Sequence, residues 1–387
     1  MEILLISFVL FIAFLIIENI QYSQRINEIA IRITVTGTRG KTSIVRALAS
    51  ILRTKGMRVL AKTTGSEAKY ILPNGEEINI IRKGLTSILE QKKLIKKASK
   101  LNVDCLITEI MSIQAENHII ETNKLIKPNI SIFSNFRPDH IDAAGVSKDA
   151  ISELYVNDIF PGSKVFINEN DINDIFLNSI NSNNCQLHKI SESDYSGIHL
   201  KERSNINHFS NNVMLVSELS KNLGLDKNTI HEGILNTKLD IGKLEIYKLV
   251  TNNKEIYFVN SFAANDPEST YQQIIKTISI LNLKKNKIVG IMPLRIDRGE
   301  RSKQWMEYLI KNPGIFNHVY FYGLHSAVLE RKIKNSEIIN KKDPDFITNY
   351  IISRSENNSI IFGLANIKGL GITLIKHWNN TGEIINN

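Results

Sequence analysis

A strand-to-helix junction near the amino terminus reads Val35-Thr36-Gly37-Thr38-Arg39-Gly40-Lys41-Thr42-Ser43. It follows an apolar run at 31–36 and opens an amphipathic pattern that ends at Gly56. Glycine, glycine, lysine and threonine at this spacing, between a strand and a helix, are typical of a phosphate-binding loop. The full motif has another glycine five positions before Gly40, where this chain has Val35, so the match is to a shortened form. The alternative is an ordinary strand-to-helix turn that needs glycines.

Each residue type in this turn has a physical role in holding nucleotide phosphates. The glycines let backbone amides approach phosphate oxygens, and the start of the helix adds the positive end of its dipole. Lys41 is placed to reach the β- and γ-phosphates, and the hydroxyl of Thr42 is placed to ligate magnesium. The residues predicted to bind ATP in this turn are Gly37, Thr38, Arg39, Gly40, Lys41 and Thr42.

Apolar runs alternate with helical patterns along the rest of the chain. One series continues at 103–108 and 130–133, and a second begins near Ile256 and runs to 359–362. This alternation predicts α/β domains with parallel sheets and crossover helices. The Asn- and Ser-rich stretch 178–210 is predicted to be irregular or inserted. The expected domains are a transmembrane anchor at 1–22, a P-loop central domain at 23–248 and a smaller α/β domain at 249–387.

The composition bounds the class of protein. Hydrophobic residues make up 42% of the 387 and charged residues 22%, which excludes fibrous and wholly disordered chains. Lys and Arg outnumber Asp and Glu by 48 to 39, an excess that suits anionic small molecules or membrane headgroups. We expect no nucleic-acid partner, because no binding motif or stripe of interleaved basic and aromatic residues accompanies the charge. The two cysteines lack zinc-binding or disulfide-framework spacing, which indicates a reducing compartment.

The amino-terminal segment is apolar enough to enter a membrane. Every residue at 3–17 is apolar except Ser7, and about 20 residues span a bilayer as a helix. A cleaved signal peptide is one alternative, but Glu2 replaces the usual positive charge and no cleavage pattern follows. A buried core helix is another, but the segment has no polar face. Basic residues lie only after the segment, so the positive-inside rule predicts a single-pass anchor in the cell membrane with cytoplasmic catalytic domains.

Two further side chains are predicted at the same edge of the sheet as the turn. Glu109 ends the apolar run that begins at 103, and His140 follows the run 130–133. Ligands gather at the carboxyl ends of parallel strands, so both side chains are expected near the phosphate site. A strand-end glutamate is as often a helix cap, and a lone histidine is more often structural. Magnesium prefers oxygen ligands, so the residue types alone give His140 no role.

Several ordered segments carry a resemblance to a known family. Residues 36–42, Glu109 and 135–142 resemble the central domain of the Mur ligase superfamily. Further segments are similar to the ATP-dependent ligase subunits of poly-γ-glutamate synthases, the PgsB/CapB family, and these are 62–65, 258–266, 295–298 and 363–369. The similarity covers nearly the whole chain, and several motifs in order are more specific than the loop alone.

This resemblance implies a P-loop Mur-ligase-like central domain and a smaller Rossmann-like domain that together act as an amide ligase. Such an enzyme phosphorylates a γ-carboxylate with ATP, and the amino group of another glutamate attacks the acyl phosphate. Lys41 would neutralise charge on the transferred phosphoryl group. Thr42 and Glu109 would hold one Mg²⁺, with Mn²⁺ as an alternative, and His140 would help to hold a second ion.

The resemblance also implies substrate contacts and partners. The second domain would bring Asn265, Asp266, Arg295 and Arg298 toward ATP or substrate. Thr64 and Arg82 are assigned to the substrate, with a solvated basic surface as the alternative for Arg82. The expected partners are glutamate, the growing poly-γ-glutamate for a capsule or a released polymer, the membrane, and small membrane subunits of a synthase and export complex.

Two other functions stay open at this point. Another amino-acid-adding ligase of the superfamily, such as a folylpolyglutamate synthase-like protein, would share all the ATP residues, although the membrane span argues against it. A membrane-anchored P-loop ATPase that energises or regulates export of a surface polymer would make no amide bond, and Glu109 with His140 favours a ligase over it. One departure from many superfamily members is that no lysine, the residue they carbamylate, lies between 149 and 162.

Overall fold

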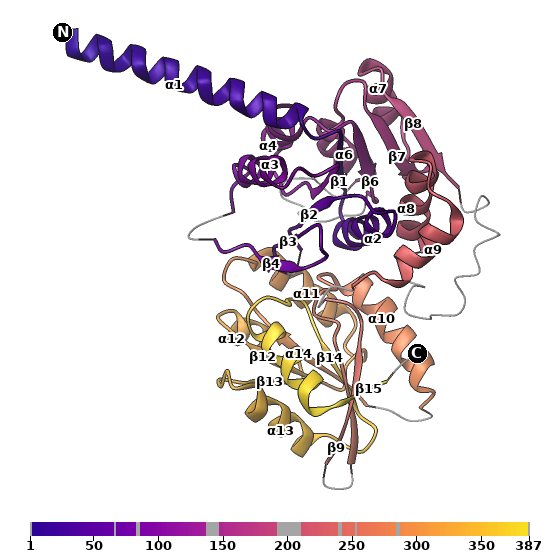
Figure 1. The fold of residues 1–387 in the computed structure, drawn as a ribbon. Coiled ribbons are helices and arrows are strands. Elements are labelled where there is room, and N and C mark those ends of the chain that lie inside the picture. Colours follow the sequence, from indigo (N-terminus) through magenta and orange to yellow (C-terminus); the bar gives the residue numbers. More distant parts are fainter. Residues whose placement is uncertain are drawn as a thin grey trace. The chain divides into compact units, whose positions relative to one another are not determined.

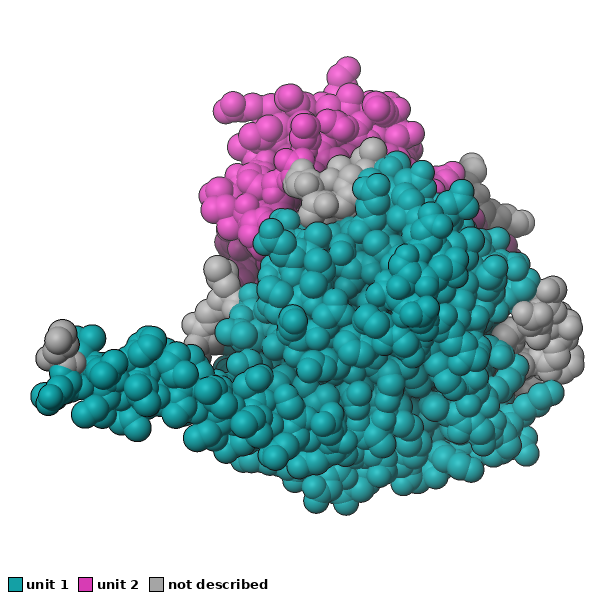
Figure 2. Space-filling model, turned by 90° about the horizontal axis from the view of Figure 1, so that it is seen from above, with its two compact units in different colours: residues 1–239 teal, residues 240–387 magenta. Residues whose placement is uncertain are grey.

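The chain forms two compact units, Met1–Leu239 and Asp240–Asn387, which Figure 2 shows in different colours. The computed structural model describes residues 2–65, 67–82, 86–136, 147–191, 210–238, 242–251, 254–283 and 287–385. Each unit is built around its own sheet with helices on both faces, so the predicted α/β class is confirmed. The predicted divisions after residues 22 and 248 stay predictions.

The sheet of the first unit has eight strands in the order β4-β3-β2-β5-β1-β6-β7-β8. Its strands are parallel except for the antiparallel pairings of β2 with β3 and of β3 with β4. The strands are β1 (Ile31–Thr36), β2 (Val59–Thr63), β3 (Lys69–Ile71), β4 (Glu77–Asn79), β5 (Cys105–Glu109), β6 (Ile130–Phe133), β7 (Lys164–Asn168) and β8 (Gln186–Ile190).

The order of these strands places the phosphate-binding turn. Strand β1 lies between β5 and β6, with β2 to β5 on one side of it and β6 to β8 on the other, so the strand order reverses at β1. Val35 is paired with Glu109, and Thr36 is paired with Phe133. Ligands of open α/β sheets bind at the carboxyl ends of strands where the strand order reverses. The turn after β1 is at such a point, with Glu109 one strand away.

Helices cover both faces of this sheet (Figure 1). On one face α2 packs against α8 and α9, and every residue of α2 from Ile44 to Leu52 except Ala47 is buried. The segment after β5 forms the short helix α4 and continues as the π-helix η1. The helices and turns of the unit are α1 (Glu2–Asn27), α2 (Lys41–Thr54), α3 (Glu90–Lys100), α4 (Ala115–Ile120), η1 (Glu121–Ile126), α6 (Lys148–Tyr155), η2 (Val156–Asp158), η3 (Glu169–Asp171), α7 (Asp174–Ser182), α8 (Ser210–Asn222) and α9 (Lys227–Leu235).

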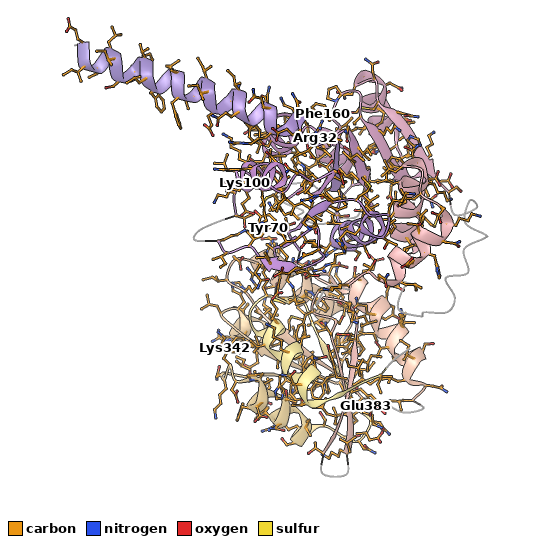
Figure 3. All side chains as sticks on the ribbon, viewed as in Figure 1. Arg32, Tyr70, Lys100, Phe160, Lys342 and Glu383 are labelled. Atoms are coloured by element: carbon orange, nitrogen blue, oxygen red, sulfur yellow. The ribbon has the colours of Figure 1, made fainter. Side chains whose placement is uncertain are left out.

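Helix α1 is the one helix in the described part of the chain that is long and apolar enough to cross a membrane. Its residues from Glu2 to Ile17 are exposed, whereas Tyr22 and Ile26 are buried against the sheet unit. The hydroxyl of Tyr22 donates to the carbonyl of Leu125 at 2.5 Å. Arg32, labelled in Figure 3, donates to backbone carbonyls at the end of the helix. The last turns of α1 therefore belong to the folded unit.

One prediction about the first unit is wrong. The stretch 178–210 is predicted to be irregular or inserted, but within it helix α7 continues to Ser182 and strand β8 pairs in parallel with β7. The side chain of Asn173 caps α7, and Phe176 and Ile180 form its buried stripe. The abundance of Asn and Ser predicts a loop. The structure is decided instead by the tertiary packing of a few apolar side chains, which overrides the local preference. Residues 192–209 of this stretch lie outside the described residues.

The second unit has a seven-stranded sheet in the order β13-β12-β11-β14-β10-β9-β15. The strands are β9 (Ile246–Thr251), β10 (Lys254–Val259), β11 (Ile288–Pro293), β12 (His318–Tyr322), β13 (Ser336–Ile338), β14 (Ile360–Gly363) and β15 (Glu383–Ile384). The helices are α10 (Pro267–Leu281), α11 (Gly299–Lys311), α12 (Ser326–Glu330), α13 (Pro344–Arg354) and α14 (Leu370–Thr381). Separate hydrophobic clusters, one around Trp378 and one around Trp305, cover the sheet.

Candidate active site

The turn after β1 has a backbone that only glycine accommodates at two positions. Gly37 and Gly40 have φ values of +107° and +85°, which side chains rarely adopt. A Cβ atom on Gly37 would lie 2.5 Å from the hydroxyl oxygen of Ser134, and one on Gly40 would lie 2.3 Å from the side-chain nitrogen of Asn212. Conformation therefore favours glycine at both positions, and at Gly37 the backbone carbonyl of Asn135, 2.9 Å from the added Cβ, leaves no space for a side chain either.

Asn135 holds this turn against the end of β6. Its side-chain oxygen accepts hydrogen bonds from the hydroxyl of Thr38 at 2.7 Å and from the backbone N–H of Arg39 at 3.3 Å. Its side-chain nitrogen donates to the carbonyl of Arg39 at 2.9 Å. Its own carbonyl accepts from the backbone N–H of Thr38 at 3.0 Å. These contacts preorganise the loop before any ligand is bound.

Lys41 lies at the start of α2 and folds back over the same turn. Its ammonium donates to the carbonyl of Gly37 and, at 3.3 Å, to the carbonyl of Thr38. Both bonds are to weak neutral acceptors, which phosphate oxygens can replace with stronger charge-assisted ones. The predicted position of Lys41 at a phosphate site is consistent with this geometry.

Glu109 is a deeply buried acid next to the turn. Its side chain is 1% exposed, and one of its oxygens accepts from the hydroxyl of Thr64 at 2.6 Å. Burial raises the pKa of Glu109, and hydrogen bonds from Thr64 and Thr42 together with the charge of Lys41 oppose that rise. Its other oxygen, Oε1, has no hydrogen-bond partner among the described residues. A buried carboxylate oxygen without a partner is costly unless a cation or a donor joins it.

The donors around Glu109 fit a magnesium ion bound together with nucleotide. Mg²⁺ in such sites takes one or two protein oxygens and completes its shell with phosphates and water. Thr42 and Glu109 supply a hydroxyl and a carboxylate, and Gly65 leaves the space beside Thr42 open, because a Cβ there would lie 2.5 Å from the Thr42 hydroxyl. No group of three or more His, Cys, Asp or Glu side chains able to hold a metal lies within the described ranges. His140 falls outside those ranges.

Behind Glu109 lies a second group of buried charged residues. Lys62, which is 0% exposed, bonds Glu90 at 3.2 Å and Gln91 at 3.5 Å. Burial lowers the pKa of Lys62, although Glu90 opposes it. Arg82, predicted to contact substrate, makes a two-pronged bond to Glu90 at 2.6 and 3.0 Å. This pairing uses part of the guanidinium of Arg82, and its predicted contact with substrate stays a prediction.

Comparison with known families accounts for this arrangement. The Mur ligase middle domain matches residues 35–231, about half of the chain, and the poly-gamma-glutamate synthase CapB C-terminal domain matches residues 246–381. The chain belongs to the Mur ligase family. The two matches fall one on each unit, and they confirm the resemblance drawn from the ordered motifs.

Individual relatives of this Mur ligase are similar over most of their length. The capsule biosynthesis protein CapB of Bacillus anthracis is 29% identical over 92% of this chain and 77% of its own. The PGA synthase CapB of Bacillus subtilis (strain 168) is 26% identical over 97% of both chains. A bifunctional folylpolyglutamate synthase/dihydrofolate synthase from Yersinia pestis has a TM-score of 0.69 at 13% identity, covering 93% of each chain. MurF from Acinetobacter baumannii has a TM-score of 0.62 at 13% identity, covering 93% of this chain and 80% of its own.

In the second unit of this Mur ligase, the predicted residues lie in loops at the carboxyl edge of its own sheet. The side chain of Asp266 caps α10 by accepting a backbone N–H at 2.8 Å. Arg295 makes a two-pronged bond to Asp297 at 2.9 and 2.6 Å, and Arg298 immediately precedes α11. Asp266 thus has a structural task, and the nucleotide roles of all these residues stay predictions.

Asn265 and the neighbouring loop after β14 are fixed by the side chains of Trp305 and Asn366, of which only Asn366 lies in a segment that carries the family resemblance. The carbonyl of Asn265 accepts from the indole of Trp305 at 3.0 Å. Asn366 donates to the carbonyl of Pro293 at 2.8 Å and accepts from Arg301 at 2.8 Å. Asn366 therefore ties the loop after β14 to the end of β11, and no pattern local to either segment predicts that link.

Sequence reasoning also missed three residues of the first unit. Asn135 was noted only as part of a resembling segment, although its place directly after a buried strand was the available signal. His118 and Asp158 form a buried pair with Nδ1 to oxygen distances of 2.9 Å. They lie 40 residues apart, and neither belongs to a recognisable motif, so the sequence held no signal for their contact.

Proposed function

We propose that this Mur ligase is an ATP-dependent enzyme that joins glutamate residues through their γ-carboxyl groups and so makes poly-γ-glutamate. The observation that carries the proposal is the convergence of the phosphate-binding turn, Lys41 and the buried Glu109 in a chain whose two units match a Mur ligase domain and a CapB domain. The capsule biosynthesis protein and the PGA synthase support the choice of polymer, since both are similar over most of this chain.

The chemistry requires two transfers in the same site. A carboxylate oxygen of one glutamate attacks the γ-phosphorus of ATP, the bond to the bridging oxygen breaks, and ADP leaves. The amine nitrogen of a second glutamate then attacks the acyl carbon, the carbon–oxygen bond to phosphate breaks, and phosphate and one proton are released. Both steps move negative charge, so fixed positive charges and donors at the turn lower their barriers.

Named residues of the first unit have distinct tasks in this scheme. Lys41 offsets the charge on the transferred phosphoryl group, and the backbone amides from Gly37 to Gly40 bind its oxygens. Thr42 and Glu109 would hold Mg²⁺, which when bound polarises the phosphate oxygens. Thr64 orients Glu109 through its 2.6 Å hydrogen bond and in this scheme acts as a positioning residue, while its predicted contact with substrate stays a prediction.

The remaining roles rest on the family resemblance. His140 is proposed to help to hold a second metal ion, and Asn265, Asp266, Arg295 and Arg298 to contact ATP or substrate. Helix α1 is proposed to anchor the enzyme in the cell membrane with both units in the cytoplasm, in contact with small membrane subunits of a synthase and export complex. The exposed apolar surface of that helix supports the anchor.

The test uses membranes that contain this chain and its neighbouring membrane subunits, supplied with ATP, magnesium and radiolabelled glutamate. Lys41→Ala is the inactive variant, and Lys55→Ala is its matched control, because Lys55 is an exposed lysine at the other end of the same helix. ATP-dependent polymer that resists ordinary proteases and is cut by a γ-glutamyl hydrolase, present with Lys55→Ala and absent with Lys41→Ala, supports the proposal. ADP release without glutamate incorporation would favour another acceptor or an anchored ATPase.

A further inference from the structure

Beneath the end of β1, on the face opposite α2, four buried polar side chains from different segments meet. Thr36 comes from β1, His118 from α4, Thr122 from η1 and Asp158 from η2, and each is at most 1% exposed. None of them belongs to the residues assigned above to nucleotide, metal or substrate. Buried polar groups are costly, so a cluster of four needs a physical explanation.

Asp158 is the centre of this cluster. Its two oxygens lie 2.9 Å from Nδ1 of His118, and Oδ1 also accepts from the hydroxyl of Thr122 at 3.1 Å. Oδ2 accepts from the hydroxyl of Thr36. The Nε2 atom of His118 is buried and has no hydrogen-bond partner among the described residues. Asp158 is therefore fully satisfied, while His118 keeps one unused ring nitrogen.

The local backbone is shaped to make these contacts. His118 and Thr122 are four residues apart, and both reach Asp158 although the helix changes from α to π between them, at Glu121. Short π segments are rare and are found frequently at functional sites. Tyr155 packs edge-on against the ring of His118 with centroids 5.5 Å apart. The histidine is thus held on one side by an aromatic ring and on another by a carboxylate.

Stability alone does not explain a buried ion pair. Replacing such a pair with apolar side chains of similar volume is often neutral or stabilising, because desolvation offsets the attraction between the charges. The cluster does, however, connect directly to the nucleotide turn. Thr36 is bonded to Gly37 in the chain, and its carbonyl accepts the backbone N–H of Ser134. Asp158 therefore fixes the side chain of the last residue before the turn.

The charges around His118 come from three other segments. Burial lowers the pKa of His118, but the charge and hydrogen bond of Asp158 and the charge of Glu121 raise it above the ordinary value of 6.5. The positive charge of Lys41 lowers the pKa of His118. The cluster and the phosphate site are thus electrostatic neighbours.

We propose that His118 and Asp158 are positioning residues of the phosphate-binding turn, which act through the hydroxyl of Thr36 to hold the turn in its binding conformation. In the proposed function their effect is on the phosphate chain of ATP, so this inference rests on that function. Asp158 fixes Thr36, and His118 fixes Asp158 and adds a positive charge beneath the turn. Neither residue is assigned a contact with the reacting atoms.

The first test compares two isosteric changes on the same face of the same strand. Thr36→Val removes the hydrogen bond to Asp158, whereas the control Thr34→Val removes a buried hydrogen bond to Ser131, 3.1 Å long, that has no link to the turn. In the full-length protein in detergent, ATP affinity is expected to fall about tenfold for Thr36→Val and to change less than about twofold for Thr34→Val. Thr36→Ser restores the hydroxyl and is expected to restore affinity. Equal losses for both valine variants would overturn the proposal.

The second test uses pH, because a purely structural role would not give a titration. In the wild type, ATP is expected to bind more weakly as pH rises through the raised pKa of His118, since the positive charge beneath the turn is lost. His118→Gln keeps a donor to Asp158 but cannot titrate. ATP itself also changes protonation with pH, but it does so equally in both proteins. The difference between the two profiles of ATP affinity against pH therefore isolates the contribution of His118. If the wild type and His118→Gln have the same melting temperature and the same profile of ATP affinity against pH, the proposal is contradicted.

The same assay separates this inference from the proposed function. If Lys41→Ala binds ATP as well as the wild type does, the nucleotide assignment fails and the positioning role fails with it. If Lys41→Ala abolishes binding while Thr36→Val and His118→Gln both match the wild type, only the positioning role fails.

Discussion

Substitution of Gly37 by alanine should damage the protein far more than the same substitution at Gly162. Both glycines have positive φ, at +107° and +74°, so each alanine variant carries a backbone cost of roughly 1–2 kcal/mol. At Gly162 nothing lies within 4 Å of the added Cβ. At Gly37 the Cβ would lie 2.5 Å from the hydroxyl oxygen of Ser134 and 2.9 Å from the carbonyl oxygen of Asn135.

The size of the difference follows from these contacts. Overpacking of this kind costs about 1–3 kcal/mol, and here one of the two clashes is with backbone, which cannot rotate away. Gly162→Ala is therefore expected to lose about 1–2 kcal/mol of unfolding free energy, and Gly37→Ala roughly 2–5 kcal/mol. The backbone shift that relieves the clash moves the amides of the turn, so ATP affinity should fall at least about tenfold.

Two measurements on the full chain check this prediction. Urea denaturation of the two variants gives the stability difference, and titration with a fluorescent ATP analogue gives the affinity difference. Gly162→Ala should bind the analogue as the wild type does, because Gly162 precedes β7 at the amino edge of the parallel strands, whereas the turn follows β1 at their carboxyl edge. The reasoning is refuted if Gly37→Ala matches Gly162→Ala in both stability and affinity.

Three further predictions concern the metal site, the unplaced histidine and the anchor. Because burial raises the pKa of Glu109 above its ordinary 4.5, the folded state holds its proton more tightly, so stability declines as pH rises from about 4.5 through the raised pKa. Glu109→Gln should therefore flatten the pH dependence of the unfolding free energy measured with urea and raise that free energy at neutral pH. The same variant should abolish metal-dependent ATP turnover. An unchanged pH dependence would contradict this prediction. His140→Ala should impair glutamate incorporation more than ATP binding, as measured by polymer yield against analogue affinity, and equal losses in both would remove its role at the acyl phosphate. Deletion of residues 2–17 should release the protein from membranes without loss of stability. Deletion of 2–27 should in addition lower the free energy of unfolding by about 3 kcal/mol, because Tyr22 and Ile26 are buried. Equal melting curves for the two deletions would refute the packing of the last turns of α1 against the first unit.

The parts of the site that the sequence predicted are those with local causes. The turn at 37–40 is recognisable because its glycines, lysine and threonine lie within one strand-to-helix junction. Glu109 was predicted because an apolar strand ends in a carboxylate, and the parallel pairing of β5 with β1 places that residue beside the end of β1. In both cases a short segment contains its own explanation, and the sheet topology supplies the rest.

The parts that were missed depend on contacts between distant segments. The hydroxyl of Thr36 and the carboxylate of Asp158 are 122 positions apart, and nothing in either segment indicates the other. Strand β8 was missed for a related reason, since its polar composition suits a loop and only pairing with β7 makes it a strand. A sequence pattern indicates the secondary structure that a segment prefers by itself. The prediction fails where packing against a neighbouring segment overrides that preference.

Glu109, which the local sequence predicted, and Asp158, which only a distant contact places, both lie near the end of β1. Together they make this edge of the sheet polar. An α/β sheet gains stability by burying apolar side chains, yet Thr34 and Thr36, and beyond them Glu109 and Asp158, are buried polar groups. Each costs desolvation free energy that an apolar residue would not. Among the described residues, Oε1 of Glu109 has no hydrogen-bond partner, and burial raises the pKa of this carboxyl group. A bound cation would offset both costs. Asp158 has all its partners, so its cost is already offset in the protein itself. The first pattern is the one expected of a ligand-binding group, and we propose that the second group, through Thr36, holds the phosphate-binding turn in place.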